Sequence, residues 1–171
     1  MVVDSDYSKA PRRPYPHAPE DTEDVAAWVL SRPSTLPPVK ESSLTLTGFS
    51  AGGNIANVLA LRLGPDRVAG LATFYGPSEM HYDPMDLQLK VPPRPTFKAG
   101  VRLPKNFNIL ARQSYIVHGT DDNAPGVSPI RADASAFPKV CSAGDFQVDG
   151  SAFKLIDPRC TGCGDDSRRR R

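Results

Sequence analysis

The stretch LTLTGFSAGGNIANVLALRL, residues 44–63, constrains the fold of this chain more than any other. Residues 43–47 alternate in the manner of a strand, and residues 51–63 carry apolar side chains at helical spacing until Gly64 and Pro65 end the pattern. Between the two segments lies Ser50, flanked by glycines as G-x-S-x-G. The sequence therefore predicts a strand, a sharp turn at Ser50 and a helix, which is the context that gives this motif meaning.

Ser50 has two interpretations at this point. As a nucleophile it would lie on a turn so tight that Gly48 and Gly52 leave room only for very small side chains, with Gly53 completing the elbow. The strained turn would push Oγ above the sheet, and the N–H of Ala51 at the helix start would face a developing oxyanion. As an ordinary glycine-rich loop, the turn would instead cradle a phosphate. That alternative lacks both the P-loop lysine and G-x-G-x-x-G, so we favour the nucleophile.

The rest of the chain alternates strands and helices. An amphipathic helix is predicted from Pro19 to the residue before Pro33, and a further helix that begins at Ser128 is predicted to run to about Phe137. Segments typical of strands are found at residues 1–3, 68–75, 114–118 and 146–156. Such alternation predicts an α/β fold with a mainly parallel sheet flanked by helices, whose site lies outside the carboxyl ends of the strands.

Domain organisation follows from length and proline content. A chain of 171 residues is one domain's worth, and we place that domain at residues 1–156. Residues 78–112 hold five prolines and little periodicity, so we expect a proline-rich, cap-like excursion that covers a substrate. Residues 157–171 end in four arginines and are predicted to be a disordered basic tail, with contact to acidic surfaces as a weaker alternative.

Composition argues against several classes of function. The formal net charge is +2, and because Arg168–Arg171 contribute +4, the other residues sum to −2 and offer no field for nucleic acid. No run approaches the roughly 18 apolar residues of a membrane span. The first residues lack the pattern of a signal peptide, so we expect a cytoplasmic protein, unless a preceding signal is missing from the sequence. Cys160 and Cys163 form a C-x-x-C without further ligands, so neither a metal site nor a cofactor is expected.

Two segments together resemble a known family. Residues 6–21, DYSKAPRRPYPHAPED, resemble the segment DYRLAPEHPYPAAPED of the hormone-sensitive-lipase-like branch (α/β-hydrolase fold-3) of the α/β-hydrolases. GFSAGGNIA, residues 48–56, resembles that branch's nucleophile elbow, GDSAGGNLA, at the expected separation. The segment VHGTDD resembles the strand end where the family places its triad acid three residues after a glycine, which is Asp122 here. The resemblance runs from Val2 to about Ala136.

The resemblance implies a partial α/β-hydrolase fold and the chemistry of a serine carboxylic-ester hydrolase. Ser50 would attack the ester carbonyl of a small-molecule substrate, a histidine would take its proton, and Asp122 would orient that histidine. The N–H of Ala51 would help to hold the oxyanion.

The sequence also departs from the family. Phe49 replaces the usual acidic residue beside the nucleophile. The H-G-G-G loop, which supplies further oxyanion donors, lies upstream of the first matching segment in the family, and this chain starts too late to contain it. No histidine follows His118, whereas the family's triad histidine follows the acid; His17, His81 and His118 are interpreted as structural or solvated, with His81 and His118 as weaker catalytic candidates.

Two functional hypotheses follow. The first is a truncated ester hydrolase whose activity is impaired, because a serine without a base stays a weak nucleophile. The second is a degenerate hydrolase that has become a small-molecule binding protein, as in some plant hormone receptors of this branch. Under either hypothesis the missing strands expose a sheet edge, so pairing between copies of the chain is expected.

Overall fold

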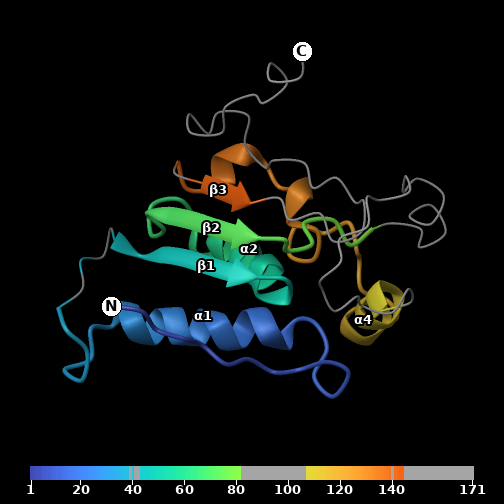
Figure 1. Ribbon diagram of the computed structural model, residues 1–171, viewed down its shortest axis with the longest axis horizontal. Coiled ribbons are helices and arrows are strands. Elements are labelled where there is room, and N and C mark those ends of the chain that lie inside the picture. The colour runs from blue at the N-terminus through green and yellow to red at the C-terminus, as the bar shows by residue number, and fades with distance from the viewer. Residues whose placement is uncertain (39, 41–42, 82–106, 140, 145–171) are drawn as a thin grey trace, which may run out of the picture.

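The computed structural model describes residues 1–38, 40, 43–81, 107–139 and 141–144. Its centre is a three-stranded sheet in the order β1 (Thr45–Phe49), β2 (Gly70–Phe74), β3 (Cys141–Gly144). Both strand pairs are parallel, with Phe49 opposite Phe74 and Leu71 opposite Cys141. The arrows in Figure 1 consequently point the same way, and the residues that follow β1 and β2 meet at one end of the sheet.

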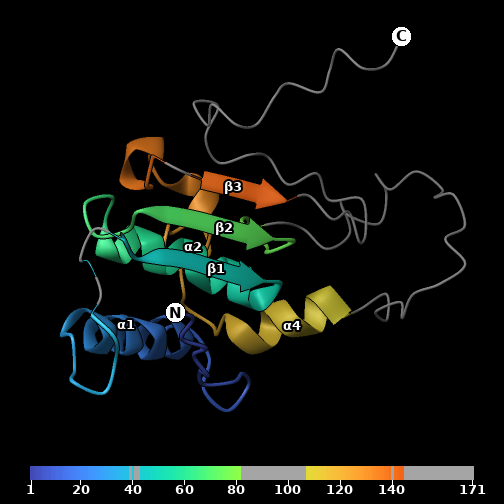
Figure 2. The same ribbon diagram turned by 60° about the vertical axis from the view of Figure 1, so that its left-hand side comes forward.

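The helices are α1 (His17–Leu30), α2 (Ala51–Leu63) and α4 (Phe107–Tyr115), with short 3-10 helices at η2 (Pro129–Arg131) and η3 (Ala134–Ala136). Figure 2 shows α2 lying across the back of β1 and β2. Helix α1 packs against α2, and an ion pair of 2.8 Å joins Glu23 in the middle of α1 to Arg62 in the last turn of α2. None of the helices in the described ranges has the length and apolar character that a membrane crossing needs.

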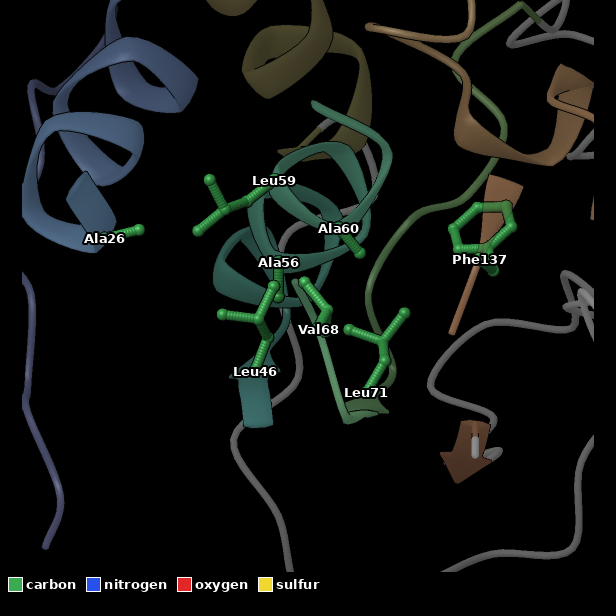
Figure 3. Close-up of a cluster of buried hydrophobic side chains, with 8 residues drawn as sticks. All are labelled: Ala26, Leu46, Ala56, Leu59, Ala60, Val68, Leu71 and Phe137. Carbon is green, nitrogen blue, oxygen red and sulfur yellow. The ribbon is translucent and has the colours of Figure 1, made fainter. Parts of the chain in front are cut away.

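The core lies between the sheet and α2. Figure 3 shows Leu46 of β1 and Leu71 of β2 pointing toward the small apolar residues of α2, with Ala26 of α1 and Phe137 at the two sides; the full cluster is Ala26, Leu46, Ala56, Leu59, Ala60, Val68, Leu71 and Phe137. Alternate side chains of β1 point the other way, and Thr45, Thr47 and Phe49 are exposed. Among the described residues, therefore, only one face of β1 is covered.

Four predicted elements are confirmed. The helix over 51–63 has the expected bounds, the helix predicted from Pro19 begins two residues earlier, and the strands over 43–47 and 68–75 appear as β1 and β2. The helix predicted from Ser128 to Phe137 is instead the two short 3-10 helices, since a β-region backbone at Ala132 and Asp133 interrupts it. The partial α/β fold with a parallel sheet and flanking helices is confirmed.

Two strand predictions are wrong. Residues 1–3 form no strand and are exposed, Val2 to 89%. Residues 114 and 115 are the last two residues of α4, and residues 116–118 follow it without forming a strand. The N–H of Ile116 donates to the carbonyl of Arg112 at 2.8 Å, and the carbonyl of Tyr115 accepts from the N–H of Tyr15 at 2.9 Å. The place beside β2 is taken by β3, which the sequence did not predict. Residues 82–106 of the cap-like excursion, the strand over 146–156 and the tail lie outside the described residues, so the domain bounds stay a prediction.

Candidate active site

Ser50 lies on a strained turn between β1 and α2. Its backbone has φ 51° and ψ −122°, a left-handed φ that is costly for any residue with a side chain. The turn is held on both sides: the N–H of Ser50 donates to the carbonyl of Phe74 at 3.0 Å, and its own carbonyl accepts from Gly53 at 2.9 Å and from Asn54 at 3.3 Å. Ser50 is exposed, and Ala51 opens α2, where the first N–H groups have no acceptor within the helix.

Two of the three predicted elbow glycines lie so close to other backbone atoms that a side chain would not fit there. A Cβ on Gly48 would lie 2.1 Å from the carbonyl oxygen of Gly52, and a Cβ on Gly53 would lie 2.9 Å from the Cα of Gly76. The expectation that Gly52 is equally crowded is wrong, because nothing lies within 4 Å of its Cβ position. Gly48 packs against the carbonyl oxygen of Gly52, whereas the Cβ position of Gly52 itself faces open space.

A buried amide links α2 to two loops at this end of the sheet. Asn54 is 2% exposed, and its Nδ2 donates to the carbonyl of Pro77 at 2.7 Å and to that of Val127 at 3.3 Å. Ser128 joins the same loops, since its hydroxyl accepts from the N–H of Met80 at 2.8 Å and donates to the carbonyl of Asp122 at 2.6 Å. Neither residue was assigned to the site from the sequence, where Ser128 was expected only to begin a helix; the one signal for this link was an asparagine on the apolar side of a helix.

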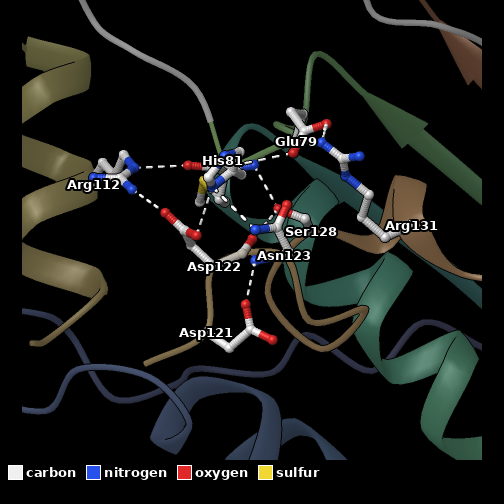
Figure 4. Close-up of polar contacts among 9 residues, drawn as sticks. Glu79, His81, Arg112, Asp121, Asp122, Asn123, Ser128 and Arg131 are labelled. Atoms are coloured by element: carbon white, nitrogen blue, oxygen red, sulfur yellow. Dashed lines mark hydrogen bonds and ion pairs between the residues drawn. The ribbon is translucent and has the colours of Figure 1, made fainter. Parts of the chain in front are cut away.

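Asp122 lies in a polar cluster beyond β2 and beside α4 (Figure 4). One carboxylate oxygen is 2.7 Å from Nδ1 of His81, and the other accepts from Arg112. Arg112 also donates from Nε to the carbonyl of Met80 at 2.7 Å, which ties α4 to the segment after β2. The hydrogen bond from His81 is the main cause that lowers the pKa of Asp122, with Arg112 acting in the same direction and burial opposing it.

The structure pairs Asp122 with a histidine, but within the described residues no hydrogen bond joins that pair to Ser50. Within the described residues, the side-chain hydroxyl of Ser50 has no hydrogen-bond partner. His118 is exposed, and His17 lies at the start of α1, 3.8 Å from Glu20. In the part of the chain that the structure describes, no three His, Cys, Asp or Glu side chains gather as metal ligands would.

Aromatic side chains flank Ser50 along both strand ends. Phe49 precedes it, and Phe74 supplies the carbonyl that its N–H contacts. The Phe49 and Phe74 rings stack with centroids 4.8 Å apart, and Tyr75 lies 6.0 Å from Phe49. The departure of Phe49 from the family's acidic residue was the sequence signal for this group.

Comparison with known proteins agrees with this geometry. Versiconal hemiacetal acetate esterase of Aspergillus parasiticus is 38% identical over 93 residues, 52% of this chain and 27% of that protein. The gibberellin receptor GID1A of Arabidopsis thaliana is 46% identical over 66 residues, 37% of this chain and 19% of the receptor. Among solved structures, the hyperthermophilic esterase of the archaeon Pyrobaculum calidifontis matches with a TM-score of 0.64 at 26% identity, covering 81% of this chain and 43% of the esterase.

The chain thus spans less than half the length of the relatives it matches. A family model described as alpha/beta hydrolase fold matches residues 1–145, which is most of the sequence. Together with the parallel sheet and the strained serine between β1 and α2, this match shows that the chain belongs to the alpha/beta hydrolase fold family.

Proposed function

We propose that Ser50 is the nucleophile of a carboxylic-ester hydrolase, and that this chain carries the activity in impaired form. The observation that supports the proposal most is the left-handed φ of Ser50 between β1 and α2, because strain of this kind is retained where a side chain must be presented. The esterases among the relatives support the reaction class. The substrate is then a small-molecule ester.

The proposed reaction uses the turn as follows. Ser50 Oγ attacks the ester carbonyl carbon while a base takes the hydroxyl proton, and the N–H of Ala51 stabilises the negative charge on the carbonyl oxygen. The C–O bond to the alcohol breaks, the alcohol leaves with a proton, and water then hydrolyses the acyl group from Ser50. Asp122 is the family's candidate for orienting the base.

We expect impaired activity because, among the described residues, no base is hydrogen-bonded to Ser50. Asp122 is paired with His81 and Arg112, and in the part of the chain that the structure describes neither of these two residues is hydrogen-bonded to Ser50. Removing the base of a serine triad costs on the order of 10⁶-fold in kcat, and removing one oxyanion donor costs roughly 10²- to 10³-fold, although the two losses do not add. We therefore expect slow turnover of activated esters and little turnover of unactivated ones.

Hydrolysis of p-nitrophenyl acetate and butyrate by the purified chain tests the proposal. The parent chain is compared with Ser50→Ala and with Ser34→Ala, a matched variant at an exposed serine outside the turn. We expect Ser34→Ala to equal the parent and Ser50→Ala to be slower. A fluorophosphonate probe should also label the parent at Ser50. Equal turnover by the parent and Ser50→Ala, with no label at Ser50, would refute the nucleophile.

A second candidate function is binding of a small molecule without turnover. It is favoured by the similarity to a gibberellin receptor over 66 residues and by the observation that, among the described residues, no histidine is hydrogen-bonded to Ser50. Under this alternative, a ligand binds equally well to the parent and to Ser50→Ala, and no ester is hydrolysed through Ser50. A cytoplasmic location stays a prediction under both.

A further inference from the structure

An aromatic cluster, defined as Phe49, Phe74 and Tyr75, lies at the carboxyl ends of β1 and β2. All three side chains are large and open to solvent, with exposed fractions of 58%, 38% and 39%. Phe49 and Phe74 stack at an interplanar angle of 14°, and Tyr75 is tilted by 51° against Phe49. Exposed aromatic side chains that gather in one place are a feature of binding surfaces rather than of ordinary protein surface.

The cluster is attached rigidly to the turn that holds Ser50. Phe49 is the residue before Ser50, and the carbonyl of Phe74 accepts the N–H of Ser50 at 3.0 Å. Tyr75, like Ser50, has a left-handed φ, of 41°. Immediately after Tyr75, Gly76 packs against the backbone of Gly53 in α2, and the N–H of Gly53 donates to the carbonyl of Ser50 at 2.9 Å.

Packing alone accounts for part of this arrangement. Cross-strand aromatic pairs stabilise sheets, and Phe49 lies directly opposite Phe74 in the register of β1 and β2. The core, however, is formed on the other face, by Leu46 and Leu71 against α2. Sheet stabilisation accounts for the pairing of Phe49 and Phe74, but not for the exposure of both rings at the strand ends beside Ser50. A binding surface beside a nucleophile accounts for that exposure.

We propose that the aromatic cluster binds an aryl group of an ester ligand and thereby holds the ester next to Ser50. The identification of the ligand as an ester rests on the proposed function, whereas the aryl preference rests on the cluster itself. The aryl group belongs to either the acyl part or the alcohol part of the ester, since both have the same stacking chemistry. Offset or edge-to-face stacking should favour an aromatic ring over a saturated ring of similar size by about two- to tenfold in Kd.

Binding tests the aryl preference without any need for turnover. The probes are acetophenone and cyclohexyl methyl ketone, which are not hydrolysed and differ in the aromaticity of the ring, with Kd measured by ligand titration in NMR. We expect the parent to prefer acetophenone and Phe49→Leu and Phe74→Leu to lose the preference. Phe107→Leu, at an exposed phenylalanine on α4, is the matched control and should keep it. If the leucine variants fail to fold by circular dichroism, Overhauser contacts from acetophenone to Phe49, Phe74 or Tyr75 of the parent decide instead.

Turnover separates this inference from the proposed function. Benzyl acetate and methyl phenylacetate carry the ring in the alcohol and the acyl part through one methylene group, so the ring is not conjugated with the reacting atoms, and each is compared with its cyclohexyl counterpart in kcat/KM. The pair with the larger preference for the aromatic ring shows which part of the ester the cluster holds. An aryl preference in binding, with no Ser50-dependent turnover, would uphold the inference for a bound aryl ligand and refute the hydrolase. Ser50-dependent turnover with equal affinity for the two ketones, or a preference unchanged in Phe49→Leu, would overturn the inference and leave the hydrolase standing.

Discussion

At the scale of single residues, the turn around Ser50 depends on which positions can accept a Cβ. Gly48 cannot, because its Cβ would lie 2.1 Å from a backbone oxygen that belongs to the same turn. Gly52 can, because its Cβ position is open and lies in the first turn of α2. Two glycines of one motif therefore have different physical reasons for being there.

This difference predicts opposite effects of the same substitution. Gly48→Ala should lower the free energy of unfolding by about 3 kcal/mol, at the upper end of the range for overpacking, and should abolish any Ser50-dependent turnover. Gly52→Ala should raise the free energy of unfolding by about 0.5–1 kcal/mol, because alanine is the better helix residue. Urea denaturation of both variants measures the pair. Equal losses in both would show that the turn does not close between Gly48 and Gly52.

The charge on Asp122 also acts at the residue scale, through pH. Its pKa is lowered in the folded chain by the hydrogen bond from His81 and by Arg112. A lowered native pKa means that the carboxylate stabilises the fold above its ordinary pKa of about 4, and that this contribution is lost as pH falls through the native value. Asp122→Asn should therefore lower Tm by a few degrees at pH 7, with the difference disappearing toward pH 2.

Thermal melts from pH 7 to pH 2 measure this pH dependence. Asp24→Asn, at an exposed position of α1, is the control and should follow the parent at every pH. A gap between Asp122→Asn and the parent that persists unchanged at the acid end would mean that the pairing with His81 and Arg112 contributes nothing to stability.

At the scale of elements, helix α2 is fixed by the polar groups on its buried side. Asn54 and Asn57 are both nearly fully buried. The Nδ2 of Asn54 donates to two loop carbonyls, whereas the side-chain amide of Asn57 has no hydrogen-bond partner in the described part of the chain. Removing a buried donor that is hydrogen-bonded leaves its acceptors without a partner, whereas removing a buried donor that has no partner relieves a desolvation cost.

The two asparagines therefore predict a second pair of opposite effects. Asn54→Leu should destabilise the chain by about 1–3 kcal/mol and loosen the segment after β2 that ends in His81, whereas Asn57→Leu should be neutral or stabilising. Urea denaturation gives the energies, and amide hydrogen exchange over residues 76–81 and 123–128 shows whether the loops open. Asn57→Leu losing as much stability as Asn54→Leu would contradict the assignment of partners.

The local sequence pattern predicted an element correctly where that pattern alone determines the structure. Residues 51–63 have a strong helical period and a Gly-Pro stop, and the observed helix has those bounds. Residues 114–118 are only five residues long, and they come shortly after Leu110, Ala111 and Arg112, which are strong helix formers. The helix continues into them, and the strand position is filled from 67 residues farther along than β2, at Cys141. Such long-range competition for a sheet edge leaves no local signature.

The site followed the same rule. The strain at Ser50 and the crowding of Gly48 follow from one short motif, so they could be predicted. The partners of Asp122 could not, because His81 lies 41 residues before it and Arg112 lies on a helix whose position the sequence did not indicate. The aromatic cluster was visible only as one unusual residue, Phe49, until the register placed Phe74 opposite it.

At the scale of the whole molecule, the described sheet ends in two open edges. Its order is β1-β2-β3, so within the described ranges β1 has no strand on its outer side and leaves backbone donors and acceptors unpaired there. Edges of this kind pair with other chains unless a charge or a covering segment prevents it. β1 carries no charge: its residues are TLTGF. We therefore expect copies of the chain to associate through β1 as concentration rises.

A lysine on β1 tests this expectation, since placing like charges across a contact between two copies costs on the order of a kcal/mol or more. Thr47→Lys should lower the association constant between copies of the chain by about tenfold, since 1.4 kcal/mol corresponds to a factor of ten. Ser34→Lys adds the same charge at an exposed position outside the sheet and should associate like the parent. Sedimentation equilibrium over a hundredfold range of concentration measures all three. A parent that stays monomeric throughout, or an equal weakening by both lysines, would show that β1 is not the pairing edge, since only an edge contact is sensitive to where the charge is placed.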